Sequence, residues 1–396
     1  MDVFASTIDC VNTAAPEAPV FCYRPHALRS AAAWFLDAFP GDPYFAVKAN
    51  PAPHILMGLW DAGVRCFDVA SDQEVKAVSA LLPEATLAFM HPVKNRAAIS
   101  AAYFAHGVRS FVLDSSAELE KICEATGHAA DLTLIVRVGV SNDGATVPLT
   151  GKFGASEAQA PRLLRHTRRV ARRLGVSFHV GSQSLAPAAW SLAMAGLSRL
   201  IAAAAVTVDV VDVGGGFPAR YAARVDLEAY RARVASAFGA MMVTEPAELW
   251  SEPGRALVAE AESLLVRVDG VKPGALYLND GGFGALYDAV HLGWDFQVRA
   301  LRPGGGLPEA HAPYALFGPT CDSADRWPHA IMLPQGLKEG DYLEFGAMGA
   351  YGRAMATGFN GFGSYDLVQV ADSPFPSAYT PCARAGTSSA RTVSYP

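Results

Sequence analysis

Short apolar runs alternate with helix-like segments between residues 44 and 255, and this alternation constrains the fold more than any other feature. The runs are rich in β-branched and aromatic residues, as β-strands are. Two of the segments between them begin with the spacing of a helix capping box, Ser71 before Glu74 and Ser115 before Glu118. The strand-like runs span residues 44–50, 66–71, 86–92, 110–115, 132–140, 176–182, 208–216 and 248–255.

Eight strand–helix units in succession predict a parallel (β/α)8 barrel of the TIM type. A doubly wound open sheet is the alternative, since eight strands do not by themselves prove closure. After residue 260, Gly and Pro turns divide strand-like pieces without helices between them, which predicts a C-terminal antiparallel β domain. We expect the barrel at 25–258 and the β domain, a β-sandwich or β-barrel, at 1–24 and 259–372. Residues 373–396, rich in Ser, Pro, Ala and Thr, are expected to form a loosely ordered tail.

Charge and composition argue against nucleic-acid and membrane partners. The net charge of −6 disfavours binding to a phosphate backbone, which needs a basic face. The basic run at 162–173 is interpreted as the solvated face of an amphipathic helix with Leu163, Leu164, Val170 and Leu174 on its apolar side. The six cysteines lack CxxC spacing and no signal peptide or apolar span is visible, so we expect a cytoplasmic protein without a metal site.

Polar residues end nearly all of the predicted strands. In a (β/α)8 barrel these C-terminal ends meet at one mouth, where active sites lie. Core packing does not explain why polar residues end so many apolar strands, so we expect these residues to line a functional site. In chain order the set is Lys48, Asp68, His91, Asp114, Arg137, His179 with Ser182, Gly214–Gly216, and Glu252 with Arg255.

The last strands of this set end in residue types that bind phosphate. Gly214–Gly216 would expose backbone N–H groups, Ser182 adds a hydroxyl, and Arg255 adds a guanidinium. Glycine-rich turns are common, so this signal is weak alone. Together with Lys48 on the first strand and an acid for a ring nitrogen, it favours a phosphorylated aldehyde held as a Schiff base, pyridoxal 5′-phosphate (PLP).

Seven blocks of the sequence resemble, in order, the signature blocks of the fold-type III PLP-dependent decarboxylases. This family comprises ornithine, diaminopimelate and arginine decarboxylases on an alanine-racemase-like barrel. The chain is most similar to eukaryotic-type ornithine decarboxylases and their bacterial relatives, from about residue 20 to residue 363. The blocks are FAVKANP, FDVAS, SFHVGS, VDVGGGFP, EPGR, GPTCDSAD and GAYGRAMATGFNGF.

The resemblance implies a role for individual residues of these blocks. Lys48 would hold PLP covalently, Glu252 would pair with the pyridine nitrogen, and His179 would stack on the ring face. Asp68, Glu74 and Arg137 would support the ring, with ion pairing or helix capping as the structural alternative. The phosphate would be bound by Ser182, Gly214, Gly215, Gly216, Gly254, Arg255 and Tyr351.

The resemblance also implies a homodimer whose active sites are shared between subunits. Cys321 would return a proton to the substrate carbon, and Asp322 would bind the distal amine, both in the neighbouring subunit's site. Phe359 would line the pocket. Lys152 and Asp325 resemble a further cross-subunit ion pair.

The substrate prediction depends on two aspartates. Asp322, where diaminopimelate decarboxylases usually have glutamate, suits a distal ammonium group. The eukaryotic-type enzymes place a second substrate-binding aspartate further along, and Asp288 is the nearest candidate. We therefore predict decarboxylation of L-ornithine first, giving putrescine, and of L-lysine second, giving cadaverine. The alternatives are carboxynorspermidine, diaminobutyrate, arginine, diaminopimelate or a carrier-bound amino acid as substrate, an amino-acid racemase, and a non-catalytic decarboxylase-like regulator.

Overall fold

The computed structural model describes residues 1–149, 151–241 and 247–379, and within them eight parallel strands close into a barrel. β12 pairs with β3, which completes the closure. The predicted (β/α)8 barrel is confirmed, and the open-sheet alternative is wrong. Around the barrel the strands are β3 (Asp42–Ala46), β4 (Cys66–Val69), β5 (Thr86–Phe89), β6 (Ser110–Leu113), β7 (Thr133–Arg137), β9 (Arg173–Ser177), β11 (Val210–Asp212) and β12 (Glu248–Ser251).

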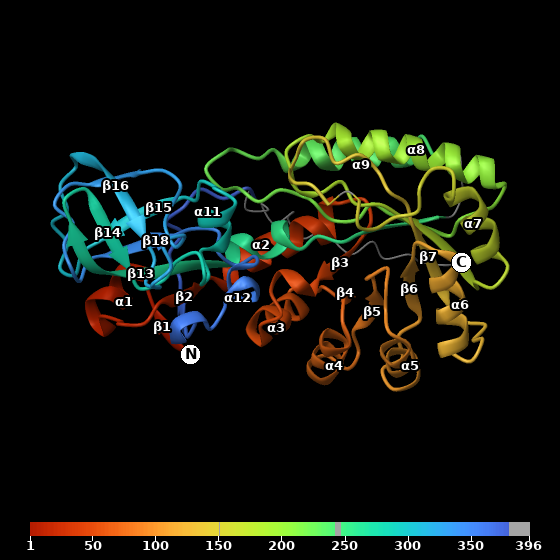
Figure 1. Cartoon of the computed structure of the whole chain (residues 1–396), viewed down its shortest axis with the longest axis horizontal. Coiled ribbons are helices and arrows are strands. Elements are labelled where there is room, and N and C mark those ends of the chain that lie inside the picture. Colours follow the sequence, from red (N-terminus) through yellow and green to blue (C-terminus); the bar gives the residue numbers. More distant parts are fainter. Residues whose placement is uncertain (150, 242–246, 380–396) are drawn as a thin grey trace, which may run out of the picture.

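Helices cover the outside of the barrel (Figure 1), and side-chain caps set where several of them begin. The Ser71 and Ser115 hydroxyls accept hydrogen bonds from the N–H groups of Glu74 and Glu118, as the capping-box spacing predicts. The helices of this part are α2 (Pro25–Ala33), α3 (Pro53–Asp61), α4 (Asp72–Leu81), α5 (Arg96–Phe104), α6 (Ser116–Ala125), α7 (Ala160–Arg168), α8 (Ala188–Ala204), α9 (Leu227–Gly239) and α10 (Arg255–Val258).

Apolar side chains fill the inside of the barrel. The rings of Tyr44 and Trp250, from the neighbouring strands β3 and β12, lie 4.4 Å apart between centroids. This packing excludes water from the strand interior, so the polar set is confined to the strand ends. The same interior cluster contains Ala88, Met90, Val112, Ile135 and Val210.

The second domain is a sheet that combines segments from both ends of the chain. Its elements are β1 (Asp2–Phe4), α1 (Thr7–Ala14), β2 (Val20–Tyr23), β13 (Glu262–Lys272), β14 (Ala275–Leu278), α11 (Tyr287–His291), β15 (Val298–Leu301), β16 (His311–Phe317), β17 (Ile331–Pro334), β18 (Tyr342–Phe345), α12 (Gly352–Met355) and β19 (Asp366–Val370). β13 lies antiparallel to β2, β14 and β18. The sheet is not wholly antiparallel, because β19 runs parallel to β1 and β2, and β14 runs parallel to β16. A parallel pair needs a long crossover, which residues 279–310 supply between β14 and β16.

The basic run folds differently from the prediction. Leu163 and Leu164 are buried on α7, but this helix ends at Arg168. Val170 is 45% exposed, and Leu174 is buried in strand β9 instead of on a helix. The apolar spacing was misleading because a helix and the strand after it bury residues in the same core.

The C-terminal segment is ordered further than predicted. Residues 373–379 pack against the rest of the chain, and the Tyr379 side chain is buried with its hydroxyl donating to the Ala256 carbonyl at 2.6 Å. Residues 380–396, the remainder of the predicted tail, lie outside the described residues. The expectation of loose order from residue 373 onward is therefore wrong for its first seven residues.

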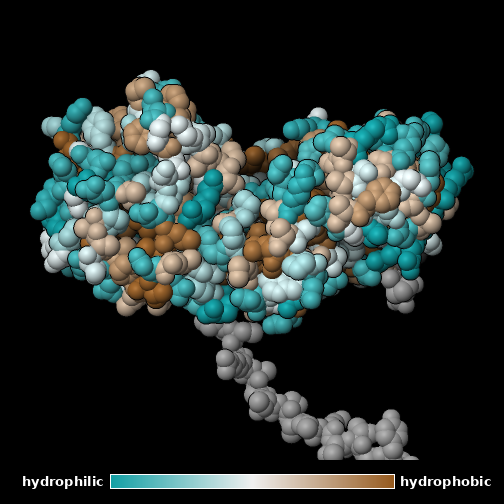
Figure 2. Space-filling view, turned by 90° about the horizontal axis from the view of Figure 1, so that it is seen from below, coloured by the Kyte–Doolittle hydropathy of each residue, from teal (hydrophilic) through white to brown (hydrophobic). Residues whose placement is uncertain are grey.

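The barrel and the β domain lie side by side along the long axis of the molecule (Figure 1). Figure 2 shows a largely polar surface, with apolar side chains gathered in patches on the β domain and near the junction. Among the helices in the described ranges, none combines the length and hydropathy that crossing a membrane requires.

Replacing Ser115 with alanine tests the cap of α6. We expect the free energy of unfolding to fall by about 1 kcal/mol, because the Glu118 N–H loses its acceptor. Ser116→Ala, one residue further along, is the matched control and should change this free energy by less than about 0.5 kcal/mol. Urea unfolding of both variants measures the difference, and equal losses would show that the hydroxyl cap does not stabilise the helix.

Candidate active site

Lys48 lies just beyond β3, in a 3-10 turn (Val47–Ala49), and 43% of its side chain is exposed. Its Nζ is 3.4 Å from Oδ2 of Asp68 on the adjacent strand β4. Asp68 is buried, and within the described residues its Oδ1 has no hydrogen-bond partner. The Asp68 carboxylate raises the pKa of Lys48 and so favours the protonated amine in the protein without a ligand.

A second lysine, Lys94, follows β5, but other groups of the protein already occupy the hydrogen-bonding positions of its amine. Its Nζ donates to the carbonyls of His91 and Val112 and lies 3.0 Å from Glu118, with the side chain fully buried. Burial lowers the pKa of Lys94 to about 8. Of the two lysines, Lys48 is the one that a ligand can reach.

Two buried carboxyl groups share the ends of the neighbouring strands β11 and β12. Asp212 is 1% exposed and Glu252 is 8% exposed. Burial raises the pKa of Asp212 to about 6, and burial with repulsion from Asp212 raises the pKa of Glu252 well above its usual range. A like charge nearby disfavours ionisation, which for Glu252 comes from Asp212 and Asp68 and for Asp212 comes from Asp68. The pair therefore holds a proton at this edge of the barrel.

The glycine loop after β11 has no room for side chains. Gly214 and Gly216 have positive φ angles of 65° and 96°. A Cβ at Gly214 would lie 2.1 Å from the Phe178 carbonyl oxygen, and one at Gly216 would lie 2.3 Å from the Gly181 carbonyl oxygen. Oδ1 of Asp212 accepts a hydrogen bond from Gly214 N at 2.8 Å and fixes the start of the loop. Such a loop of bare backbone lets an anion approach closely.

Arg255 begins α10, immediately after Gly254, and its guanidinium is enclosed by aromatic rings. Its Cζ lies 4.3 Å from the ring centroid of Trp294 and 4.5 Å from that of Tyr351. Nη1 donates to the Tyr221 hydroxyl at 2.6 Å and to Oδ2 of Asp288 at 3.0 Å. Nε is buried and lacks a hydrogen-bond partner in the described ranges, so the group retains donor capacity.

Gly254 and Tyr351 occupy tight backbone positions at this end of the site. A Cβ at Gly254 would lie 3.0 Å from the Ala49 Cβ, one residue after Lys48. Tyr351 comes from the β domain with a positive φ of 65°, and its N–H donates to the Ala49 carbonyl at 2.7 Å. The turn that carries Lys48 is thus in contact with both domains.

His179 lies in the loop after β9, beside the glycine loop. Its Nδ1 accepts a hydrogen bond from Gly181 N at 3.0 Å, so the proton of the neutral ring is on Nε2. Burial lowers the pKa of His179 well below its usual range, with Arg137 and Lys48 adding to the effect. The imidazole is therefore a neutral, flat surface at neutral pH.

Three supporting residues occupy distinct positions. Arg137 ends β7 and lies near enough to Lys48 and His179 to shift their pKa values. Ser182 begins a short strand, β10 (Ser182–Ser184), which pairs with β8 (Ala145–Val147). Glu74 accepts a hydrogen bond from Ala70 N at 2.6 Å, one residue before the Ser71 cap of α4, so its carboxylate helps fix the start of this helix.

Cys321 and Asp322 lie on an exposed loop of the β domain. Their hydrogen bonds in the described residues are local: Cys321 Sγ and N both donate to Oδ1 of Asn360, and Asp322 accepts from Ala324 N. Within this chain they are therefore not bound to Lys48 or its neighbours.

Two further predicted residues lie near that loop. Phe359 is 42% exposed, with its ring 5.0 Å from that of Phe283. Asp325 is buried, and its carboxylate accepts hydrogen bonds from Gly282 N and from the N–H and hydroxyl of Thr320. The ion pair predicted between Asp325 and Lys152 would require this carboxylate to be uncovered.

The sequence prediction missed three residues of this arrangement. Asp212 lies two residues before the glycines, and an acid at a strand end was the available signal. Tyr221 and Asn360 carried no such signal, because they act as hydrogen-bond partners of Arg255 and Cys321 from distant parts of the chain.

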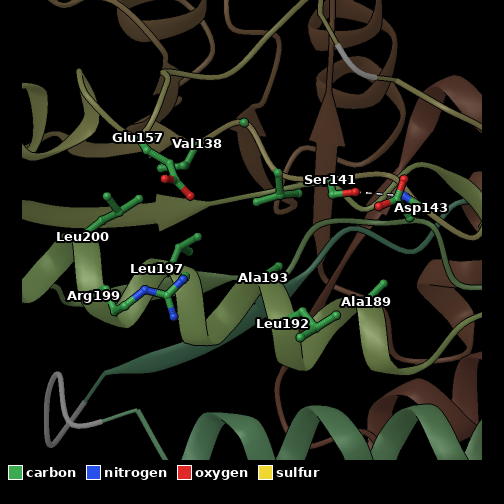
Figure 3. A pocket seen from close by; sticks show the side chains of 13 residues that line it. Val138, Ser141, Asp143, Glu157, Ala189, Leu192, Ala193, Leu197, Arg199 and Leu200 are labelled. Carbon is green, nitrogen blue, oxygen red and sulfur yellow. Dashed lines mark hydrogen bonds between the residues drawn. The ribbon is translucent and has the colours of Figure 1, made fainter.

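A groove of about 370 Å³ lies elsewhere, between α8 and the loop that follows β7 (Figure 3). Leu192, Ala193 and Leu197 from α8 form one wall, and Glu157 and Arg199 lie along it. None of the residues predicted for the active site lines this groove.

The residues at the barrel mouth fit PLP. Lys48 offers an exposed amine, and the Asp212–Glu252 pair offers a proton for a ring nitrogen. At the other end, the bare glycine loop and the unpartnered Nε of Arg255 suit a phosphate group.

Comparison with known proteins identifies the family. A family model described as "pyridoxal-dependent decarboxylase, pyridoxal binding domain" matches residues 26–259, more than half of the chain. The chain belongs to this family. The predicted PLP cofactor and decarboxylase class are thereby confirmed, while the roles of individual residues stay predictions.

Three relatives illustrate the similarity. The lysine/ornithine decarboxylase of Selenomonas ruminantium is 32% identical over 342 residues, which cover 84% of each protein. The ornithine decarboxylase of Panagrellus redivivus is 33% identical over 350 residues, covering 81% of this chain and 78% of that protein. The solved arginine decarboxylase of Paramecium bursaria Chlorella virus, bound to agmatine, superposes with a TM-score of 0.82 at 28% identity, covering 91% of this chain and 98% of that one.

The raised pKa of Asp212 predicts a pH-dependent stability of the protein without PLP. The folded-state pKa of about 6 exceeds the usual value of about 3.9, so the stability contributed by the proton is present at low pH and is lost as the pH rises through 6. In Asp212→Asn, the amide side chain would stay neutral while its Oδ1 could still accept from Gly214 N. We therefore expect the Tm of this variant relative to wild type to increase between pH 5 and 7.5.

Thermal unfolding scans of the two apo-proteins across that pH range measure the effect. Glu84→Gln, which changes an exposed acid, is the control and should follow wild type throughout. Parallel curves for wild type and Asp212→Asn would show that the buried pair does not retain a proton.

Proposed function

We propose that this chain decarboxylates a basic L-amino acid, L-ornithine in preference to L-lysine, to give carbon dioxide and a diamine. The observation that carries the proposal is the exposed Lys48 amine at a barrel mouth that also buries the Asp212–Glu252 pair. The names of the relatives, which cover ornithine, lysine and arginine, support a basic substrate.

PLP, when bound, supplies a ring that accepts the electron pair left behind by departing carbon dioxide. Lys48 is its proposed covalent anchor, and the neutral His179 would stack on its face. Glu252 would pair with the ring nitrogen, and burial with the nearby Asp212 raises the pKa of Glu252, so that this side chain could supply the proton. Arg137, Asp68 and Glu74 surround this set as supporting charges and hydrogen-bond partners.

The proposed phosphate end combines groups from both domains. The glycine loop and Ser182 offer neutral donors, and Arg255 offers the positive charge. Gly254 keeps the backbone close to the Lys48 turn, and Tyr351 covers the Arg255 guanidinium. Phosphate at Arg255 would compete with Asp288 for the same guanidinium, which would free the Asp288 carboxylate to accept the distal ammonium of the substrate.

In this proposal, the loop at residues 321 and 322 returns a proton to the substrate carbon and binds the distal amine of the substrate. The Cys321 thiol, which donates a hydrogen bond to Oδ1 of Asn360 at 3.2 Å, is the proposed proton donor. Asp322 is exposed and can pair with a distal ammonium. Since neither residue contacts the Lys48 set within one chain, we propose that both act in the neighbouring subunit of a homodimer, where Phe359 lines the pocket.

Product detection by mass spectrometry tests the proposal. Purified protein with added PLP is offered L-ornithine, L-lysine, L-arginine, diaminobutyrate and meso-diaminopimelate, beside Lys48→Ala. We expect putrescine from ornithine and less cadaverine from lysine, with neither amine formed by the variant. Bound PLP without any diamine product would overturn the substrate assignment while leaving the family intact.

Asp322 is tested separately. Because a charged hydrogen bond to the substrate is lost, Asp322→Asn should raise KM for L-ornithine by roughly 10- to 100-fold. Ser323→Ala, an exposed neighbour on the same loop, should leave KM unchanged. Steady-state kinetics at saturating PLP measure both, and an unaltered KM in Asp322→Asn would remove this residue from the substrate site.

A further inference from the structure

Residues 372–379 form a clasp that runs from the β domain to the helix of Arg255. At its start, the Asp372 carboxylate accepts hydrogen bonds from Arg24 at 2.8 Å and from Arg299 at 3.1 Å. Further along, the ring of Phe375 packs directly on Gly346, where a Cβ would lie 2.7 Å from it. The clasp is therefore fixed to the β domain before it reaches the barrel.

The middle of the clasp is held by a half-buried acid next to the barrel. The Glu260 carboxylate accepts hydrogen bonds from the Ser377 hydroxyl and from Ala378 N, the latter at 2.7 Å. The Ser377 carbonyl accepts from Nη1 of Arg220 at 3.1 Å. Arg220 directly precedes Tyr221, whose hydroxyl accepts from Arg255. One branch of the clasp thus contacts the residue next to the hydrogen-bond partner of Arg255.

The end of the clasp contacts the short helix α10 itself. Tyr379 is 6% exposed, and its hydroxyl donates to the carbonyl of Ala256, the residue after Arg255. Its ring lies 6.3 Å from that of Trp34, the residue at the C-terminal end of α2. A four-residue helix has few internal hydrogen bonds, so contacts from outside determine where its first residue lies.

We propose that this clasp, through Tyr379, positions Arg255 for the phosphate of PLP and so sets the affinity for the phosphorylated cofactor. Tyr379 is a positioning residue, since it acts through the Ala256 carbonyl and touches no reacting group. The inference rests on the proposed placement of the phosphate at Arg255. A segment that follows strand β19 of the β domain would thus influence cofactor binding in the barrel.

Comparing PLP with pyridoxal, which lacks the phosphate, tests the clasp without measuring activity. The change in absorbance on titrating apo-protein gives a Kd for each compound. Loss of one hydrogen bond in Tyr379→Phe should weaken PLP binding by about 5-fold and change pyridoxal binding by less than about 2-fold. Tyr379→Ala should weaken PLP binding further, again without a matching effect on pyridoxal.

Two reference variants make the outcomes distinguishable. Arg255→Gln should lose affinity for PLP but not for pyridoxal, and Tyr314→Phe, a buried tyrosine of the β domain, should bind both as wild type does. Equal losses for both compounds in Arg255→Gln would overturn the phosphate placement and the clasp with it. The clasp alone would be overturned if Arg255→Gln lost affinity for PLP only, while Tyr379→Phe lost affinity for PLP and pyridoxal equally or for neither.

Discussion

Closure of the parallel barrel forces three carboxyl groups, from Asp68, Asp212 and Glu252, into one buried mouth. Burying unpaired negative charge is costly, and the protein reduces this cost in two ways. Lys48 lies 3.4 Å from Asp68, and burial raises the pKa values of the other two acids, which favours their neutral forms. A cationic ring nitrogen beside Glu252 would supply a further counter-charge. The buried negative charge that is costly in the protein alone would therefore favour binding of the cofactor of this family.

The opposite end of the mouth is organised by contacts between the domains. Arg255 belongs to the barrel, but Asp288, Trp294 and Tyr351, which surround its guanidinium, come from the β-domain part of the chain. The clasp adds a second connection from that side through Tyr379. An anion site built across a junction depends on how the two domains are fixed together.

Much of the barrel mouth could be predicted from the sequence because each strand end is a local signal. Lys48, Asp68, His179 and the glycines all follow short apolar runs, and closure of the barrel brings such ends together. Sequence did not reveal that Asp212 raises the pKa of Glu252, since their proximity depends on strands β11 and β12 being neighbours.

Other features depended on contacts that sequence spacing does not encode. Helix α7 ends before Leu174 because this residue belongs to the next strand. Tyr379 is ordered because its hydroxyl bonds to the Ala256 carbonyl and its ring packs near Trp34. Asp288 was predicted as a substrate ligand, and its bond to Arg255 became visible only in three dimensions.

Reduction with borohydride followed by peptide mapping tests whether Lys48 is the residue that binds PLP covalently. Protein incubated with PLP is reduced to fix any Schiff base, digested, and the modified lysine is identified by mass spectrometry. We expect a pyridoxyl group on Lys48, whose side chain is 43% exposed. Modification of Lys94, the buried lysine with a pKa of about 8, or no site-specific modification, would contradict it.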